Sequence, residues 1–142
     1  MNTVQPIRDK GTVMDIADYL HDKNPRDYVM FMTGIYSGLR ISDILTLRVR
    51  DVKNRDHISI REKKTGKERR FKINADLRRI LRDYIDGKPD YEYLFKSPRG
   101  NKPITRQQAY NILSEAGEKF GVESVGTHTL RKTFGFHMYQ GT

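Results

Sequence analysis

The sequence lacks several features that would assign it to a common functional class. It contains no cysteine among its 142 residues, which excludes disulfides, a thiol nucleophile and thiolate metal sites. No stretch approaches the roughly 18 consecutive apolar residues of a membrane-spanning helix, and the first residues lack the apolar core of a secretory signal. The chain also has no HExxH motif, Cys/His cluster or Walker loop. We therefore expect an intracellular protein with no metal or other cofactor.

Positive charge is what the sequence has in excess. Lysine and arginine number 27 against 18 aspartate and glutamate residues, so the formal net charge is +9. Both signs are mixed along the chain, unlike the single-sign runs of disordered tails. Apolar residues make up 36%, enough for a modest core in one domain. This balance predicts a polyanionic partner.

Apolar residues at helical spacing predict several helices in the first third of the chain. Thr12 is the expected N-cap of the first helix, over 12–21. Pro25 suits the first turn of a second helix, which should end at Gly38. A short helix over Ile41–Leu47 is expected to follow directly.

The rest of the sequence predicts one hairpin and then more helices. Alternating apolar residues on both sides of Thr65-Gly66 predict an antiparallel β-hairpin over 57–73. The later elements expected are a helix capped by Asn74, a loop over 86–104 with a short strand at Tyr93–Phe95, a helix opened by a Thr105/Gln108 capping box, and a last helix over 129–140. The predicted fold class is therefore α+β, mainly helical, with one small antiparallel hairpin.

Two motifs in the first half could carry chemistry, and each has an ordinary alternative. In SGLRISD (37–43), Arg40 and Asp43 can pair at the start of a helix, and the alternative is a surface ion pair of little consequence. In KKTGKERR (63–70), the lysines of a basic hairpin can contact a nucleic-acid backbone. The alternative is a solvated strand edge whose charge discourages pairing.

A third motif, HTLRK (128–132), lies at the start of the expected last helix. His128 and Arg131 are three residues apart, so their side chains can converge on an anion at the helix N-terminus. Histidine can pass protons near neutral pH, whereas arginine supplies a fixed charge. Taken alone, the motif is better explained as an exposed polar first turn. The remaining cations, around the later helices and the 86–104 loop, are most simply a solvated surface, and only as a group would they form a DNA-facing patch.

Taken in order, these motifs resemble the catalytic domain of the tyrosine recombinases, the phage integrase family. The matching strings are TGIYSGLRISDILTLRVRDV (33–52), KKTGKERRFKI (63–73), PITRQQAYNIL (103–113) and THTLRKTFG (127–135). A lone HxxR would be weak evidence for the family, but these motifs in this order and at domain-scale separation are strong evidence. The resemblance implies site-specific DNA recombination, by integration or excision, through a 3′-phosphotyrosyl intermediate and without a metal.

The resemblance also implies a role for each matching residue. Arg40 and Arg131 would neutralise the charge that gathers on the phosphate oxygens. Lys64 would protonate the leaving 5′ oxygen, and His128 would assist proton transfer. Asp43 would orient and support the site without touching the phosphate. The residues expected to contact the DNA backbone are Lys63, Lys67, Arg106 and Lys132.

The sequence departs from the family pattern after HTLRK. In the family a second site histidine or tryptophan follows, and then the nucleophilic tyrosine. His137 and Tyr139 do not occupy the corresponding motif, so neither receives that role. The N-terminal DNA-clamping domain of the family also has no counterpart. The prediction is a single incomplete catalytic domain over 1–142 that is inactive alone.

The sequence leaves two other functions open. One is a non-catalytic DNA-binding or regulatory module on the recombinase scaffold, and the other is a generic basic nucleic-acid-binding helical domain. The expected partners are double-stranded DNA and other recombinase protomers in a synaptic complex, with no membrane. The expected location is the bacterial cytoplasm, at the nucleoid, for a protein encoded by a bacterium or a phage.

Overall fold

The computed structural model describes residues 7, 9–61 and 65–122. In chain order these form α1 (Lys10–Lys23), α2 (Pro25–Ser37), α3 (Ile41–Ile44), α4 (Val49–Val52), β1 (His57–Arg61), β2 (Glu68–Lys72), α5 (Ala75–Ile85) and α6 (Arg106–Lys119). The predicted mainly helical fold with one small antiparallel hairpin is confirmed. The helix expected over 129–140 lies outside the described residues.

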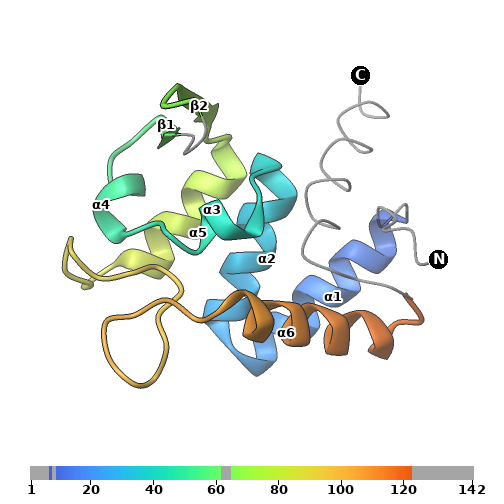
Figure 1. Ribbon diagram of the computed structural model, residues 1–142. Helices are drawn as coiled ribbons and strands as arrows, with labels where there is room; N and C mark the ends of the chain where they lie inside the picture. The colour runs from blue at the N-terminus through green and yellow to red at the C-terminus, as the bar shows by residue number, and fades with distance from the viewer. Residues whose placement is uncertain (1–6, 8, 62–64, 123–142) are drawn as a thin grey trace.

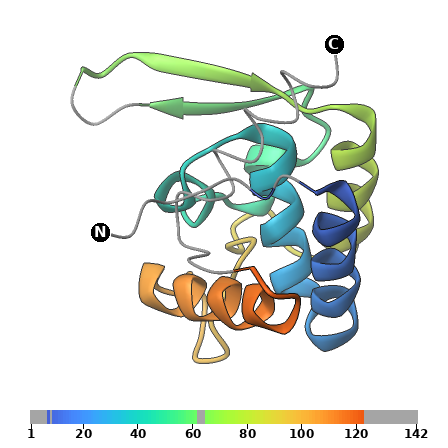
Figure 2. The ribbon, with the colours of Figure 1, turned by 90° about the vertical axis from the view of Figure 1, so that its right-hand side faces the viewer.

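Helix α2 is the centre of the domain and packs against α1, α3 and α5 (Figure 1). Its Met30 and Phe31 side chains are fully buried. The hairpin lies at one end of the helical body and α6 at the other, as both ribbon views show (Figures 1 and 2). None of the described helices is long and apolar enough to cross a membrane.

The predicted boundaries of α2 are confirmed. The Asn24 side chain accepts a hydrogen bond of 3.0 Å from the Arg26 N–H, and Pro25 occupies the first turn. At the other end, Gly38 adopts a left-handed conformation with φ 69°, which glycine reaches without the steric penalty of a Cβ.

The predicted start of α1 is wrong by two residues. Asp9 is the N-cap, because its carboxylate accepts a 2.9 Å hydrogen bond from the Gly11 N–H. Thr12 instead donates its hydroxyl to the same carboxylate at 3.2 Å. The helix therefore begins at Lys10, two residues earlier than the apolar spacing indicated, and ends at Lys23, two residues later.

The helix expected over 41–47 is shorter than predicted, and a second short helix follows it. Helix α3 ends at Ile44, and α4 begins at Val49 after Arg48. The Arg48 N–H donates to the Asp51 carboxylate at 2.8 Å, and the Val49 N–H donates to the Glu92 carbonyl at 2.8 Å. A partner more than forty residues away thus fixes the start of α4.

The predicted hairpin is confirmed, with β1 antiparallel to β2. Ile58 lies opposite Phe71, and Ile60 lies opposite Arg69. Ile58 is fully buried and Phe71 half-buried, so this face of the hairpin turns toward the helices. Because side chains alternate along a strand, the neighbouring residues face the other way.

The caps predicted for the later helices are confirmed. The Asn74 side chain accepts from the Leu77 N–H at 2.8 Å, and Thr105 and Gln108 form a reciprocal capping box. The short strand expected at 93–95 is wrong, because Tyr93 makes only an isolated bridge with Arg48. The 86–104 segment is otherwise loop, as predicted.

Candidate phosphate-binding site

The turn after α2 is built to hold one short segment of backbone still. The buried Ser37 hydroxyl donates to the Thr33 carbonyl at 2.5 Å and accepts from the Leu39 N–H at 3.1 Å. Gly38 lies between these bonds in its left-handed conformation. These two hydrogen bonds fix the backbone where it leaves α2, immediately before Arg40.

Arg40 is an exposed side chain on an anchored backbone. Its neighbours Leu39 and Ile41 are 2% and 3% exposed. Its carbonyl accepts hydrogen bonds of 3.0 Å from the N–H groups of Asp43 and Ile44, which open α3. A side chain that starts from such a fixed point can be aimed at a ligand at little entropic cost.

The ion pair expected between Arg40 and Asp43 is not formed in the described part of the chain, where no salt bridge joins them. Arg40 precedes α3 with extended backbone angles (φ −66°, ψ 146°) instead of lying in its first turn. Three-residue spacing brings side chains together only when both lie on the helix. The sequence-based expectation of a helical pair is therefore wrong.

Arg40 and Asp43 nevertheless line the same hollow, about 530 Å³ in volume, which we call the Arg40 hollow. One wall is the turn between Gly38 and Leu47 with Asp51, and the other comes from both strands of the hairpin. Residues from the arginine motif and from the basic hairpin, predicted separately, thus border one space. The hairpin lysine that the resemblance assigns to the site, Lys64, lies outside the described residues.

The hairpin also brings two arginines to the hollow that the sequence analysis missed, Arg61 and Arg69. The Arg61 guanidinium donates to the Gly66 carbonyl at 3.0 Å and thereby closes the turn. The guanidinium of Arg69 lies 5.3 Å from the centre of the Phe71 ring. The alternation of Arg69, Phe71 and Ile73 places these three side chains on one face of the hairpin. Arg61 lies on the other face and also borders the hollow, so alternation alone does not predict which cations line it.

The other predicted site residues are not all within the described structure. Lys67 is exposed in the hairpin turn, and Arg106 is exposed in the first turn of α6, away from the Arg40 hollow. The remaining predicted residues lie outside the described segments: Lys63, Lys64, His128, Arg131 and Lys132. Their assigned roles stay predictions.

A polar cluster fixes α6, the helix that carries Arg106, against α1. The Tyr19 hydroxyl donates to the Glu115 carboxylate at 2.6 Å, and the Lys23 ammonium donates to it at 3.2 Å. The hydrogen bond from Tyr19, with that from Lys23, holds the pKa of Glu115 below its usual value. The same carboxylate raises the pKa of Lys23. Both groups therefore stay charged at neutral pH, and their contact holds α6 against α1.

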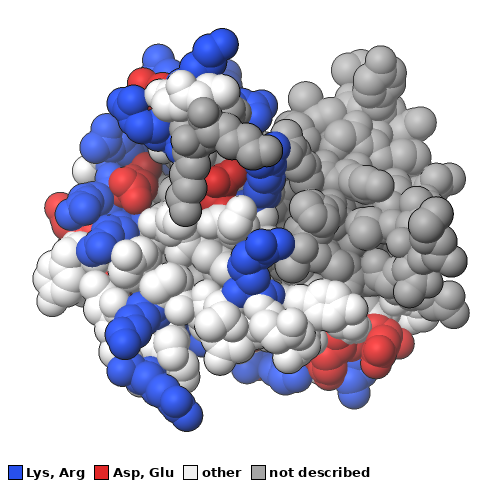
Figure 3. Space-filling model, in the orientation of Figure 1, with Lys and Arg blue, Asp and Glu red and all other residues white. Residues whose placement is uncertain are grey.

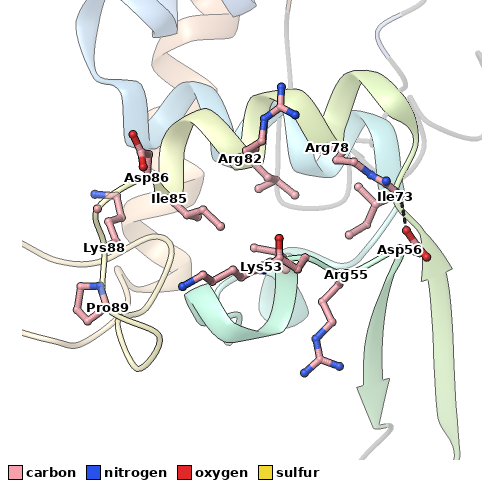
Figure 4. A pocket seen from close by; sticks show the side chains of 14 residues that line it. Lys53, Arg55, Asp56, Ile73, Arg78, Arg82, Ile85, Asp86, Lys88 and Pro89 are labelled. Carbon is pink, nitrogen blue, oxygen red and sulfur yellow. Dashed lines mark hydrogen bonds and ion pairs between the residues drawn. The ribbon is translucent and has the colours of Figure 1, made fainter.

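A larger hollow of about 850 Å³ lies between α4 and α5 (Figure 4), and we call it the α4–α5 groove. Its cations are more numerous than those of the Arg40 hollow: Lys53, Arg55, Arg78, Arg82 and Lys88. Figure 4 shows the Arg55 and Arg82 side chains pointing away from each other, out of the groove. They do not converge on a common point.

Carboxylates neutralise most of the other groove cations. Arg78 pairs with Asp56 at 2.6 Å, drawn as a dashed line in Figure 4, and Lys53 pairs with Asp90 at 3.1 Å. On the face drawn in Figure 3, lysine and arginine gather over the hairpin and lower on the same side of the molecule, with acidic residues between them. Positive charge alone thus does not mark one binding site.

Arginine and lysine are the side chains here that suit an anion. Among residues 7, 9–61 and 65–122, no three histidine, aspartate or glutamate side chains are grouped so that they could hold a metal ion. An exposed guanidinium on an anchored turn suits a phosphate, because its planar fork matches two phosphate oxygens.

Comparison with known proteins gives a family for the chain. The model described as the phage integrase family matches residues 9–142. The chain belongs to the phage integrase family. It is 51% identical over 142 residues to the probable integrase/recombinase YoeC of Bacillus subtilis (strain 168), covering all of this chain and 78% of YoeC. It is 31% identical to the tyrosine recombinase XerA of Pyrococcus furiosus, covering 81% of this chain and 41% of that relative.

Solved structures of integrases share the fold. A crystal structure of XerA recombinase superimposes with a TM-score of 0.78 at 21% identity, covering 98% of this chain and 52% of that one. The Lambda integrase (residues 75–356) bound to DNA gives a TM-score of 0.72 at 14% identity, covering 99% and 53%. The chain thus spans about half the length of these integrase chains.

Proposed function

We propose that this chain is the phosphate-binding part of a recombinase that breaks and rejoins DNA at specific sites. The observation that carries the proposal is the position of Arg40, exposed on an anchored turn in a hollow shared with the basic hairpin. Family membership and the names of the relatives, an integrase/recombinase and a tyrosine recombinase, support it. The partner is double-stranded DNA, and further protomers would assemble on it in a synaptic complex at the bacterial nucleoid.

In the proposed reaction, a tyrosine oxygen attacks the phosphorus and the 5′ oxygen leaves. Negative charge grows on the non-bridging oxygens, and Arg40 with Arg131 would neutralise it. Lys64 would give the proton that the 5′ oxygen needs in order to leave, and His128 would assist proton transfer. Asp43, half-buried at the rim of the hollow, would support the site without contacting the phosphate.

The contacts to neighbouring backbone phosphates are assigned to Lys63, Lys67, Arg106 and Lys132. Lys67 and Arg106 are both exposed, on the hairpin and on α6. Each phosphate neutralised by a cation releases counterions, so duplex binding should weaken as salt rises. Affinity that stays constant between about 50 and 200 mM salt would contradict binding through this basic face.

The 142 residues are proposed to hold the phosphate without forming the covalent intermediate, because no tyrosine in them occupies the family's nucleophile motif. Incubation with a nicked suicide substrate, followed by denaturing electrophoresis, tests this directly. We expect no covalent protein–DNA adduct from this chain. An adduct that maps to a tyrosine within residues 1–142 would show that the chain carries its own nucleophile.

A non-catalytic DNA-binding or regulatory module on the same scaffold is the second candidate, favoured by the unmatched nucleophile motif. It predicts salt-dependent duplex binding that does not depend on Arg40 more than on other exposed arginines. Such a module needs cations near the DNA but does not need one of them at a fixed point. Comparison of arginine variants therefore separates the two candidates.

A further inference from the structure

A short loop that precedes α6 projects from the helical body. Residues 96–103 form this loop, which lies below α6 in Figure 1, and we call it the projecting loop. An isolated bridge between Lys96 and Pro103 closes its base. Arg99 and Lys102 are both exposed on it. The loop therefore extends from a closed base and carries two exposed cations.

Hydrogen bonds brace the projecting loop against the rest of the domain. The half-buried guanidinium of Arg26 donates to the Lys96 carbonyl at 3.1 Å. The Asn101 side chain accepts from the Tyr93 N–H at 2.9 Å and donates to the Tyr91 carbonyl at 3.1 Å. A braced loop gives up less conformational freedom when it binds a partner than a loose loop does.

The four cations in and just before the projecting loop form two pairs with different surroundings. Lys88 and Lys96 are half-buried, and their ammonium groups lie 3.7 and 3.4 Å from the Glu92 carboxylate. Arg99 and Lys102 are exposed, and within the segments that the structure describes no carboxylate pairs with either side chain. The second pair therefore has positive charge that is left for another molecule.

The projecting loop continues directly into the basic first turn of α6. Arg106, assigned above to a backbone phosphate, follows Lys102 by four residues. The loop and α6 lie at one end of the helical body, and the hairpin that borders the Arg40 hollow lies at the other (Figures 1 and 2). Cations at this end would therefore meet phosphates other than the one that Arg40 holds.

We propose that the projecting loop is a second DNA-binding element, in which Arg99 and Lys102 contact backbone phosphates away from the Arg40 hollow. The inference rests on the proposed function, since it takes duplex DNA as the partner of this chain. Neither residue takes part in the reaction at the phosphate that Arg40 holds. Together with Arg106 they hold the duplex at a second point and fix the direction in which it crosses the domain.

The test compares two double variants of the full 142-residue chain, each of which removes two positive charges. Arg99→Gln/Lys102→Gln changes the unpaired cations, Lys88→Gln/Lys96→Gln changes the paired ones, and Arg40→Gln is the reference. The probe is a linear duplex of mixed sequence and about 30 base pairs, roughly 100 Å long, so that it can reach both ends of the domain. Its affinity is measured by fluorescence anisotropy at several salt concentrations. Circular dichroism of each variant checks that the fold is kept.

We expect Arg99→Gln/Lys102→Gln to weaken binding about tenfold, which is about threefold for each lost contact. The slope of log affinity against log salt should fall by about 1.8, because each phosphate contact contributes about 0.9. Lys88→Gln/Lys96→Gln should weaken binding less than about twofold and keep the slope. If that control does not fold, Lys102→Gln and Lys96→Gln make the same comparison with one charge, and only Lys102→Gln should lower the slope by about 0.9.

Equal losses of affinity and slope in the two double variants, with Arg40→Gln strongly impaired, would overturn the role of the projecting loop alone. The same conclusion follows if Arg99→Gln/Lys102→Gln binds the duplex as the unchanged chain does, or if the two single variants have equal slopes. The proposed function itself fails in a different way, if Arg40→Gln binds the duplex as the unchanged chain does.

Discussion

The Arg40 hollow and the α4–α5 groove differ in what fixes their arginines. The groove is larger, about 850 against 530 Å³, and it has more cations around it. Yet Arg55 lies between two exposed residues, whereas Arg40 lies between two buried ones. A site for one phosphate needs a cation at a defined point, and the number of cations nearby does not supply that. The smaller hollow therefore meets the requirement better.

The largest effect is expected from Ser37→Ala, which acts on the anchor of the hollow. It leaves the buried Leu39 N–H without its acceptor and should lower the free energy of unfolding by about 1–3 kcal/mol. Ser97→Ala is the matched control, because the Ser97 hydroxyl also accepts from the N–H two residues on, that of Arg99, but at an exposed position. Ser97→Ala should lower the free energy of unfolding, measured with urea, by less than about 0.5 kcal/mol. Equal losses would show that the turn after α2 is not specially anchored.

A second comparison uses one left-handed glycine from each region. Gly38 (φ 69°) precedes Arg40, and Gly87 (φ 79°) lines the groove. A Cβ in this conformation costs about 1–2 kcal/mol, so Gly87→Ala, at an exposed position with open space, should lower the free energy of unfolding by about this amount. Gly38 is buried, so Gly38→Ala should cost at least as much. Only Gly38→Ala should also weaken duplex binding, measured by anisotropy, because only it shifts Arg40. Duplex affinity reduced equally in both variants would contradict this.

A smaller effect, dependent on pH, is expected beside the groove. Burial raises the pKa of Tyr84 to about 12, and its hydroxyl donates to the Leu94 carbonyl at 2.6 Å. The phenol ionises near pH 10 in the unfolded chain, so its contribution is complete below pH 10 and is lost as the pH rises toward 12. Tyr84→Phe should cost about 1 kcal/mol at pH 7 and flatten this alkaline decline in urea unfolding. If the free energy of unfolding declines as steeply with pH in the variant, Tyr84 is not the group responsible for the decline.

Local signals in the sequence were sufficient where both partners of a contact are close in the chain. The Asn74 cap, the Thr105/Gln108 capping box and the glycine at the end of α2 were all predicted from neighbouring residues. Short-range hydrogen bonds satisfy helix ends without help from the rest of the fold. For the same reason the hairpin could be predicted from its alternation and its turn.

The predictions were wrong where the local structure depends on a distant segment or on the backbone conformation of a neighbouring residue. Helix α4 was missed because its Val49 N–H is satisfied by Glu92, far along the chain. Arg40 and Asp43 were expected to pair as helix neighbours, but the turn at Gly38 leaves Arg40 extended. Sequence order suggested that the arginine motif and the hairpin act together, but it could not show which hairpin cation faces the hollow.

The most direct test of the account compares Arg40→Gln with Arg82→Gln. Both arginines are exposed, and each variant removes one positive charge, from the hollow or from the groove. Duplex affinity measured by anisotropy should fall about tenfold for Arg40→Gln, and the slope against log salt should fall by about 0.9. Arg82→Gln should change affinity less than about twofold. If the two variants bind equally well, or if Arg82→Gln binds more weakly, the Arg40 hollow is not the phosphate site.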